Sequence, residues 1–456
     1  MCMPLGACLA FAGMEGTVPF LHGSQGCATY IRRYLISHFH EPMDIASSAF
    51  GESSTIFGGE PNLHEGVCNV TRVYRPQLIG VATTCLTETI GEDVPPMLRR
   101  IADPAAGPLA RLIQQTGVRP PALVHAPTPS YAGTHADGFS AAVAAAVDTL
   151  AQPGDVTDTV AVLPGIVSTA DLRHLGELLA AFGLRHTLMP DWSDRLDGPT
   201  VARYDRLPPG GTALADIVAL GRSRAALSLG GLVSPGVARA GDLLERRFGV
   251  AHTRLPFPVG IRLTDAFVDT LAALAGTPDQ PRRHPAWLTG ERGRLVDAYV
   301  DSHKYVAQRR AVVYGDEDLV VGLAAFLSEI GVRPVVCATG GRSGRLAASL
   351  VDAAPELADR IAAGEVRVME DTDFAEIEAA ARQASPDLLV GHSKGYKVAR
   401  ALAVPLVRVG LPLHDRIGAQ RVRHLGYRGA QELFDRVVNA VIEQRQDASP
   451  VGYSYM

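Results

Sequence analysis

The chain has 456 residues, of which 47% are hydrophobic and 20% charged, and its formal net charge is −5. These values are typical of a globular protein of roughly two to four domains. They exclude the strongly basic surface that nucleic-acid binding needs and the polybasic segment of a membrane-anchored protein. No apolar run is long enough to span a bilayer, and the first residues lack the charged start of a secretory signal, so we expect a cytoplasmic protein that binds neither nucleic acid nor membrane.

Apolar, strand-like runs alternate with helical patterns along the chain. In chain order, these runs are 75–84, 158–165, 224–231, 309–315, 333–341 and 386–393. Each run ends in a turn that contains Gly, Ser or Asp, and a helical pattern follows. This alternation is typical of βαβ units with parallel sheets, in which sites lie in the turns that follow the strands.

Two Pro- and Gly-rich segments, 151–158 and 275–293, predict linkers. The sequence therefore predicts an α/β fold with three Rossmann-like domains, each built on a parallel sheet. The predicted domains are 1–155, 156–275 and 290–445, with a loose tail at 446–456.

Three of the six cysteines lie at the predicted start of a helix. Cys2 precedes Met3 and Pro4, Cys27 follows the turn Gly-Ser-Gln-Gly, and Cys85 follows the first of these strands. Free backbone N–H groups and the helix dipole favour a thiolate at such positions, so we expect a lowered thiol pKa. The same groups would offset the negative charge of a thiolate-bound iron–sulfur cluster.

The other three cysteines are interpreted as structural thiols. Cys8 lies within an apolar helix, Cys68 lies in the segment NLHEGVCNVTRVY, and Cys337 lies within a strand. No C-x-x-C pair is present, so the local pattern of a zinc site is missing. Three isolated thiols cannot complete a four-thiolate cluster, and a cluster here would need ligands from a second chain. The spacing alone leaves ligation and a plain structural role both open.

Two charged patterns in the first predicted domain are interpreted without a catalytic role. His38 and His40 could bind a metal, but residues two apart do not share a helix face. Glu88, Glu92 and Asp93 follow Cys85 and are interpreted as a solvated or partner-facing acidic turn.

Two motifs in the third predicted domain are interpreted as ordinary turns. The segment ATGGRSG at 338–344 could bind an anion through its backbone, but it lacks the glycine and lysine order of nucleotide-binding loops. The segment GHSKG at 391–395 matches the serine-nucleophile pattern G-x-S-x-G. Only Asp415 and His424 follow it in the order that a hydrolase needs, so we interpret it as a strand-to-helix turn.

Long motifs over nearly the whole chain resemble the β-type subunits of the nitrogenase component 1 family. These motifs are 2–63, 81–94, 125–133, 315–327, 386–395 and 405–429. The resemblance implies that Cys2, Cys27 and Cys85 bind one half of a P-cluster at the boundary with a homologous α-type subunit. The α-type subunit would supply three more cysteines within an α2β2 heterotetramer. Ser130, in TPSYAG, falls where some β-type subunits use a serine oxygen as an extra ligand of the oxidised cluster.

The family has several branches, and the sequence departs from some of them. Dinitrogen-reducing β subunits usually carry a long extension before the first cysteine, whereas Cys2 stands near the start here. Many cofactor-assembly scaffold subunits read STG where this chain reads TTC at 83–85. Retention of Cys85 favours an [8Fe–7S] P-cluster and an electron-relaying reductase, such as the methylthio-alkane reductases. The alternative is a scaffold subunit with a [4Fe–4S] cluster.

The implied activity is electron relay from an ATP-dependent [4Fe–4S] reductase homodimer to an iron–sulfur cofactor in the α-type subunit. No catalytic residue is expected in this chain. Gly6, Gly23 and Gly26 are expected either to admit backbone close to the cluster or to be plain turn and packing glycines. Tyr30, one helical turn after Cys27, is expected to lie in the core rather than over the cluster.

Overall fold

The structure is a computed structural model that describes residues 1–203, 205–276 and 283–451. Its strands form three sheets, and every strand pairing with a defined register is parallel. The sheets use separate stretches of chain, 17–126, 157–255 and 310–408. The predicted α/β fold with three parallel-sheet domains is therefore confirmed, whereas the predicted domain boundaries stay predictions.

The described residues divide into two compact units, each with its own hydrophobic core. The first unit comprises Met1–Thr169, His186–Ser228 and Gly236–Thr253. The second comprises Ala170–Arg185, Leu229–Pro235 and the described part of Arg254–Met456. The first unit contains the first sheet and most of the second, and the second unit contains the third sheet.

The first sheet has the strand order β2-β1-β3-β4. Its strands are β1 (Thr17–His22), β2 (Ala46–Ser47), β3 (Leu78–Thr83) and β4 (Ala122–Ala126). Its helices are α1 (Met3–Ala12), α2 (Gln25–Phe39), α3 (Glu52–Phe57), α4 (Glu60–Tyr74), α5 (Cys85–Ile90), α6 (Val94–Ala102), α7 (Pro108–Thr116) and α8 (His135–Leu150). The connections reverse direction between β1 and β3, and α/β proteins place their sites at the carboxyl ends of such a strand pair.

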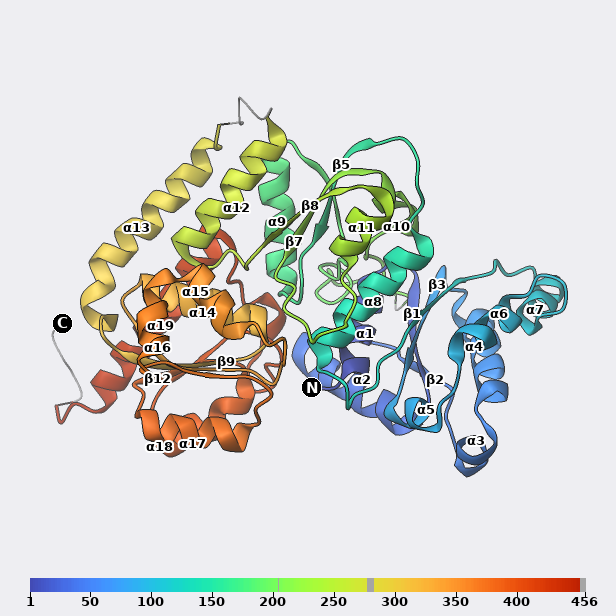
Figure 1. The fold of residues 1–456 in the computed structure, drawn as a ribbon, viewed down its shortest axis with the longest axis horizontal. Helices are drawn as coiled ribbons and strands as arrows, with labels where there is room; N and C mark the ends of the chain where they lie inside the picture. The colour runs from blue at the N-terminus through green and yellow to red at the C-terminus, as the bar shows by residue number, and fades with distance from the viewer. Residues whose placement is uncertain (204, 277–282, 452–456) are drawn as a thin grey trace. The chain divides into compact units, whose positions relative to one another are not determined.

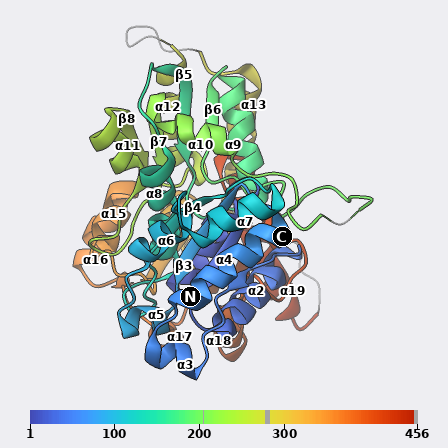
Figure 2. The same ribbon diagram turned by 90° about the vertical axis from the view of Figure 1, so that its right-hand side faces the viewer.

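Helices cover both faces of the first sheet. β1 and β3 are buried at every position, which is typical of strands in a parallel sheet. One face packs on α4, α6 and α7 through Val18, Phe20 and their neighbours (Figure 2). The other face packs on α1 and α8 (Figure 1). At Gly80 a Cβ atom would meet the ring of Phe11, so α1 lies directly against β3.

The second sheet repeats this topology with the order β6-β5-β7-β8. Its strands are β5 (Thr157–Leu163), β6 (Arg185–Leu188), β7 (Ser223–Leu229) and β8 (Ala251–Leu255). The helices of this stretch are α9 (Thr169–Ala181), α10 (Leu214–Ala219), the 3₁₀ turn η1 (Leu220–Arg222), α11 (Ala240–Phe248) and α12 (Gly260–Ala275).

The third sheet is doubly wound, with the order β11-β10-β9-β12-β13. Its strands are β9 (Arg310–Tyr314), β10 (Arg333–Ala338), β11 (Arg367–Met369), β12 (Leu388–Gly391) and β13 (Leu406–Arg408). Its helices are α13 (Ala286–Val306), α14 (Glu317–Glu329), α15 (Leu346–Ala353), η2 (Pro355–Leu357), α16 (Ala358–Ala362), α17 (Phe374–Ala384), η3 (Ser393–Gly395), α18 (Tyr396–Leu402), η4 (Ala419–Arg421) and α19 (Gly426–Asp447). Figure 1 shows α17 and α18 on one face of this sheet and α14 to α16 on the other.

Two segments predicted to be irregular are partly helical. The predicted linker 275–293 contains the start of α13, because Pro285 is accommodated as its N-cap and the residues after it favour a helix. Residues 277–282 of that linker lie outside the described residues. The predicted tail begins inside α19, and its residues 452–456 also lie outside the described part. Among the helices that the structure describes, none combines the length and the apolar character that a membrane span requires.

Candidate metal centre

Two of the predicted ligand cysteines lie on neighbouring turns at the carboxyl edge of the first sheet. β1 and β3 are paired in register up to His22 and Thr83, so the chain leaves both strands side by side. α2 follows β1 with Cys27 as its third residue, and α5 follows β3 with Cys85 as its first. The strand order therefore brings together two cysteines that are far apart in the sequence.

Hydrogen bonds join these two turns. The His22 carbonyl accepts the Thr84 N–H at 3.0 Å and the Thr87 hydroxyl at 2.6 Å. Gly23 has φ +138°, and a Cβ atom there would meet the Thr84 side chain. Gly23 is therefore needed for both the backbone conformation and the close approach of the turns.

Cys2 occupies the N-cap of α1, beside the start of α8. It forms an isolated antiparallel bridge with Thr134, and the His135 N–H donates to the Met1 carbonyl at 3.0 Å. Thr134 and Asp137 form a capping box at the start of α8. The sequence pattern T-x-x-D could have indicated this helix start, although not its proximity to Cys2.

Cys27 lies within electrostatic reach of both Cys2 and Cys85. The pKa of Cys27 is raised, first by burial and then by the charges of Cys2 and Cys85, against an opposing effect of its backbone N–H group. The expectation of a lowered pKa is therefore wrong for Cys27, because burial and like charge outweigh the helix start. Bonding to iron would offset this repulsion, since the positive charge of a metal stabilises the thiolates that it binds.

Two of the remaining cysteines differ from this group in their burial. Cys8 and Cys337 are fully buried, and burial raises the pKa of both, that of Cys337 to about 12. Cys68 is half-buried against the core of the first sheet. Cys27 is likewise half-buried, whereas Cys85 is exposed.

The donor set suits a cluster better than a single ion. Across the described ranges, no group of three or more His, Cys, Asp or Glu side chains converges on one metal position. An iron–sulfur cluster bonds its thiolates to different irons, so its ligands need not converge. Soft thiolates are also the preferred donors of such clusters.

A buried His–Glu pair lies between the ligand-bearing turns. His22 Nε2 is 2.5 Å from Glu92 Oε2, and the two side chains are 0% and 5% exposed. The pKa of His22 is lowered by burial, which outweighs the opposing effect of Glu92. His22 Nδ1 also bonds Ser48 Oγ at 3.0 Å, and the Gly59 N–H donates to Glu92. The prediction that Glu92 is solvated is therefore wrong, and no local pattern could have paired residues 70 positions apart.

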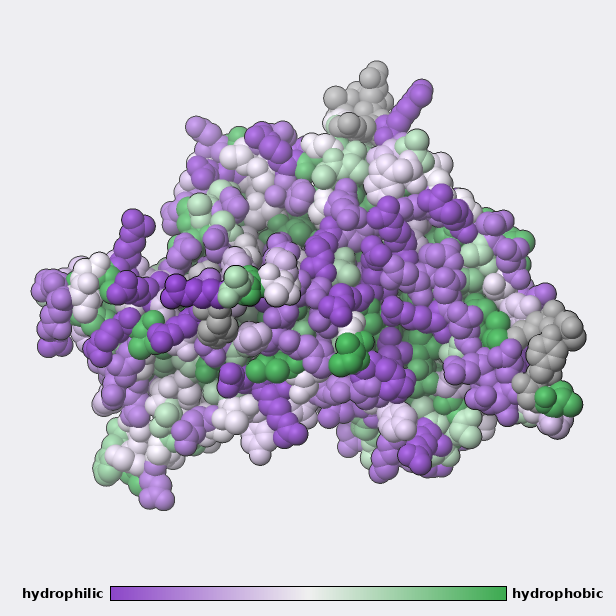
Figure 3. Space-filling view, turned by 180° about the vertical axis from the view of Figure 1, so that it is seen from behind, coloured by the Kyte–Doolittle hydropathy of each residue, from purple (hydrophilic) through white to green (hydrophobic). Residues whose placement is uncertain are grey.

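Exposed apolar side chains surround the cysteine-bearing turns. Tyr30, three residues after Cys27, is 65% exposed, so its predicted place in the core is wrong. Tyr131, next to the half-buried Ser130, is 63% exposed. Ile56 and Phe57 on α3, which contacts α5, are 73% and 84% exposed. At the lower left of Figure 3, hydrophobic residues lie on the surface at the tip that contains α3.

The glycines near the cysteines have different roles. A Cβ atom at Gly6 would meet the backbone of His135, so Gly6 serves helix packing. At Gly26 a Cβ atom would meet only the Ser24 hydroxyl, at 3.7 Å, so the chain leaves the space beside Gly26 open.

The hydrolase pattern does not assemble a catalytic triad. The Ser393 hydroxyl donates to the Pro412 carbonyl at 2.9 Å. Asp415 is paired with Arg408 at 2.7 Å, whereas His424 is paired with Asp171 at 3.0 Å. Sequence reasoning missed the Asp171 partner, which lies 253 positions away.

The glycine-rich turn at 338–344 does bind anionic groups, but they belong to the protein. Glu317 accepts the Ser343 N–H at 3.0 Å, and Glu370 accepts the Gly344 and Leu346 N–H groups at 2.9 and 2.6 Å.

His38 is buried whereas His40 is exposed, which agrees with the interpretation that they do not share a metal.

Three parallel sheets covered by helices, with three thiols at helix starts, define the class of the protein as a multidomain α/β protein. The chain belongs to the family described as nitrogenase component 1 type oxidoreductase, whose sequence profile matches residues 2–442. The predicted family membership is therefore confirmed, and the chain is an oxidoreductase-type subunit.

Named relatives match over nearly their whole length. The nitrogenase molybdenum-iron protein beta chain of Methanothermobacter marburgensis is 36% identical, over 97% of this chain and 93% of the relative. The nitrogenase iron-molybdenum cofactor biosynthesis protein NifN of Rhodobacter capsulatus is 32% identical, over 96% and 89%. The solved structure titled "Nitrogenase Cp1 at pH 6.5" is 31% identical, with a TM-score of 0.89 over 100% of this chain and 95% of that chain. Iron–sulfur chemistry follows from this membership, whereas the cluster type does not.

Proposed function

We propose that this chain is the β-type subunit of a nitrogenase-like reductase and that Cys2, Cys27 and Cys85 bind half of an [8Fe–7S] P-cluster. The other half would bind to a homologous α-type subunit in an α2β2 heterotetramer. The observation that carries the proposal is the grouping of three thiols at three helix starts, with Cys27 in the field of the other two. The cluster would supply one-electron transfer between an ATP-dependent [4Fe–4S] reductase homodimer and a cofactor in the α-type subunit.

The residues of this chain would bind and orient the thiolates. Cys2, Cys27 and Cys85 sit within the first turn of α1, α2 and α5, where backbone N–H groups offset negative charge. Gly23 permits the close approach of the turns, and the buried pair of His22 and Glu92 fixes them. Such supporting contacts orient metal ligands and adjust the redox potential of the metal.

The exposed side chains beside the cysteines support a second chain at this surface. Tyr30, Phe57 and Tyr131 are each more than 60% exposed, and aromatic residues are enriched in protein interfaces. A covering α-type subunit would bury them and exclude water from the cluster.

We assign the complex to the cytoplasm because all six cysteines are free thiols, as in reducing compartments.

We further propose Ser130 as an oxygen ligand of the oxidised cluster. It lies half-buried in the turn after β4, and the nearby Thr128 bonds Thr83 at the end of β3 through both its N–H and its hydroxyl. Ser130→Ala should change the EPR signals of the oxidised cluster and leave the reduced cluster without a signal, as in the wild type.

A scaffold subunit with a [4Fe–4S] cluster is the second candidate, favoured by the similarity to NifN.

For the reductase we propose methylthio-alkanes as substrates, with C–S bond reduction in the α-type subunit. The support is the sequence resemblance and the complete set of three cysteines. The complex should then release a thiol from a methylthio-alkane, whereas ammonia from dinitrogen would contradict this assignment.

The deciding experiment uses the complex with its α-type subunit, purified without oxygen. Iron and acid-labile sulfide are measured per heterodimer, and EPR spectra are recorded after dithionite and after mild oxidation. A reduced state without an EPR signal that gains signals on oxidation, with iron for a large cluster, would support the P-cluster. A single signal under dithionite that disappears on oxidation, with about four irons at the boundary, would support the scaffold. No iron would refute both.

A further inference from the structure

A pocket of 460 Å³ lies in the second unit, at the edge of the third sheet where its strands begin. Arg310, Arg333 and Arg367 are the first residues of β9, β10 and β11, and all three line it. Arg360 on α16 and Glu365 complete the charged lining. Four guanidinium groups thus face one carboxylate, on a chain whose net charge is −5.

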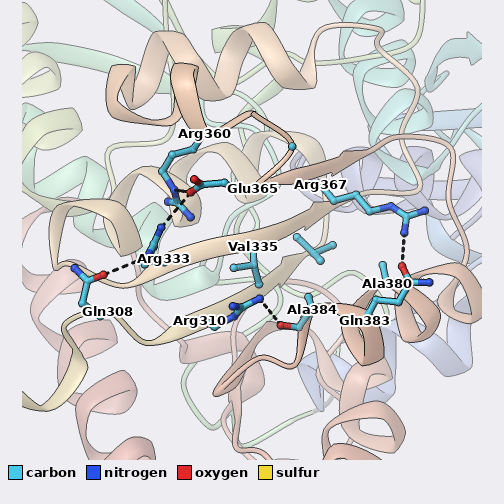
Figure 4. A pocket seen from close by; sticks show the side chains of 12 residues that line it. Gln308, Arg310, Arg333, Val335, Arg360, Glu365, Arg367, Ala380, Gln383 and Ala384 are labelled. Atoms are coloured by element: carbon cyan, nitrogen blue, oxygen red, sulfur yellow. Dashed lines mark hydrogen bonds and ion pairs between the residues drawn. The ribbon is translucent and has the colours of Figure 1, made fainter. Parts of the chain in front are cut away.

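The internal contacts of these arginines leave most of their charge uncompensated. Arg333 and Arg360 share the Glu365 carboxylate, at 3.1 and 3.3 Å. Figure 4 shows Arg333 and Arg360 joined to Glu365, with Arg310 and Arg367 elsewhere in the lining of the same pocket. Arg310 donates to the Ala384 carbonyl at 2.6 Å, and Arg367 donates to the Gln383 side chain at 3.3 Å. Within the described residues, both therefore bond through a single guanidinium nitrogen, although the group offers five N–H donors.

We propose that this pocket binds a small polyanion with two or more phosphoryl or carboxyl groups. Guanidinium groups bind phosphate and carboxylate through paired hydrogen bonds, and a hollow in which positive charge predominates concentrates the field. Arg333 and Arg310 are paired in register on neighbouring strands about 5 Å apart, whereas Arg367 is paired with Val336, three residues or about 10 Å further along β10. The three strand-borne arginines therefore match anionic groups spread along a short molecule.

The size of the pocket favours a small ligand over a macromolecule. Its volume falls within the range of small-molecule sites, roughly 300 to 1,000 Å³. Val335 and Ala380 give it an apolar floor on which a short carbon skeleton could rest. The site does not depend on the proposed electron relay, because none of its residues belongs to the cysteine-bearing unit.

The test measures binding to the full chain by calorimetry at low salt, with pyrophosphate and tricarballylate as probes and inorganic phosphate as reference. We expect at least one probe to bind about tenfold more tightly than phosphate, with an affinity that falls as salt rises. A preference for pyrophosphate would identify a phosphoryl ligand, and a preference for tricarballylate a carboxylate ligand. If a glutamate peptide bound more tightly than both probes, the pocket would be a docking site for an acidic protein segment and the proposal would be wrong.

Variants distinguish the pocket from other basic surface. Arg310→Gln and Arg367→Gln should each weaken binding of the tighter probe about tenfold, because each removes a charge-assisted pair of hydrogen bonds. Arg382→Gln is the matched control, since Arg382 lies on α17 beside Gln383 but pairs with Glu378 outside the pocket. Glu365→Gln should tighten binding by removing the one carboxylate, so this result is informative even if an arginine variant fails to fold. Equal affinity in Arg310→Gln, Arg367→Gln and Arg382→Gln would overturn the proposal.

Discussion

Cys85 and Cys68 are both accessible thiols of the first unit, but only Cys85 belongs to the group that interacts with Cys27. Cys85→Ala should remove roughly half or more of the iron at the subunit boundary, because a cluster that loses a thiolate ligand is poorly bound. Cys68→Ala should retain that iron, since Cys68 packs against the core of the first sheet. The measurement is iron per heterodimer after anaerobic purification, and equal iron in the two variants would contradict the ligand assignment.

Asp171 and His424 form a buried ion pair within the second unit. Burial raises the pKa of Asp171, but the charge of His424 and the N–H groups of His424 and Leu425 lower it overall, to about 2. Burial lowers the pKa of His424, but Asp171 raises it overall. The contribution of this ion pair to the stability of the fold is therefore complete between about pH 4 and pH 6.5. It is lost as the pH falls toward 2 or rises through the pKa of folded His424.

Two substitutions separate the charge of Asp171 from its hydrogen bonds. Asp171→Asn retains an oxygen for the two backbone N–H groups, and we expect it to lower the free energy of unfolding by about 1–3 kcal/mol at pH 6. Asp171→Ala removes both the charge and the hydrogen bonds, and it should lower the free energy of unfolding by about 3–5 kcal/mol. Denaturant unfolding across pH checks this, because the difference between wild type and Asp171→Asn should shrink above the pKa of His424. A difference that does not vary with pH would show that the pair is not charged.

At the scale of elements, α1 and α8 pack through glycines, and this packing positions Cys2. A Cβ atom at Gly138 would meet the backbone of Met3, next to Cys2. Gly138→Ala should therefore destabilise the protein by about 1–3 kcal/mol and lower the iron content, although no ligand is changed. Gly293→Ala is the control, because Gly293 lies within α13 with nothing within 4 Å of its Cβ position. That substitution should be neutral or stabilise by about 0.5–1 kcal/mol. Equal effects in thermal unfolding would refute the packing argument.

At the scale of the whole molecule, the accessibility of the cysteines reports the partner. In the isolated chain, iodoacetamide should modify Cys85 first, because it is exposed, and should leave Cys8 and Cys337 unmodified until the chain unfolds. In the complex, Cys85 should be protected while the half-buried Cys68 keeps its rate. Mass spectrometry of the alkylated peptides gives both rates. Persistent modification of Cys85 in the intact complex would argue against a partner over this surface.

The sequence by itself determined the local structure and the family. Strand runs such as 309–315, the helix starts at Cys2 and Cys85, and the resemblance to β-type subunits could all be predicted, because apolar periodicity, capping and motifs depend on neighbouring residues. Only the tertiary structure decided which turns meet. The adjacency of Cys27 and Cys85 follows from the pairing of β1 with β3, although β2 comes between them in the chain.

The buried pairs and the thiol pKa were also decided by tertiary structure. Glu92 was expected in solvent and lies against His22, and Asp171 was not identified as the partner of His424. Burial and charge at such sites depend on segments that meet only in the folded chain, and no local pattern records them. For the same reason the pKa of Cys27 is raised rather than lowered. A helix start acts locally, whereas desolvation and the neighbouring thiolates act through the fold.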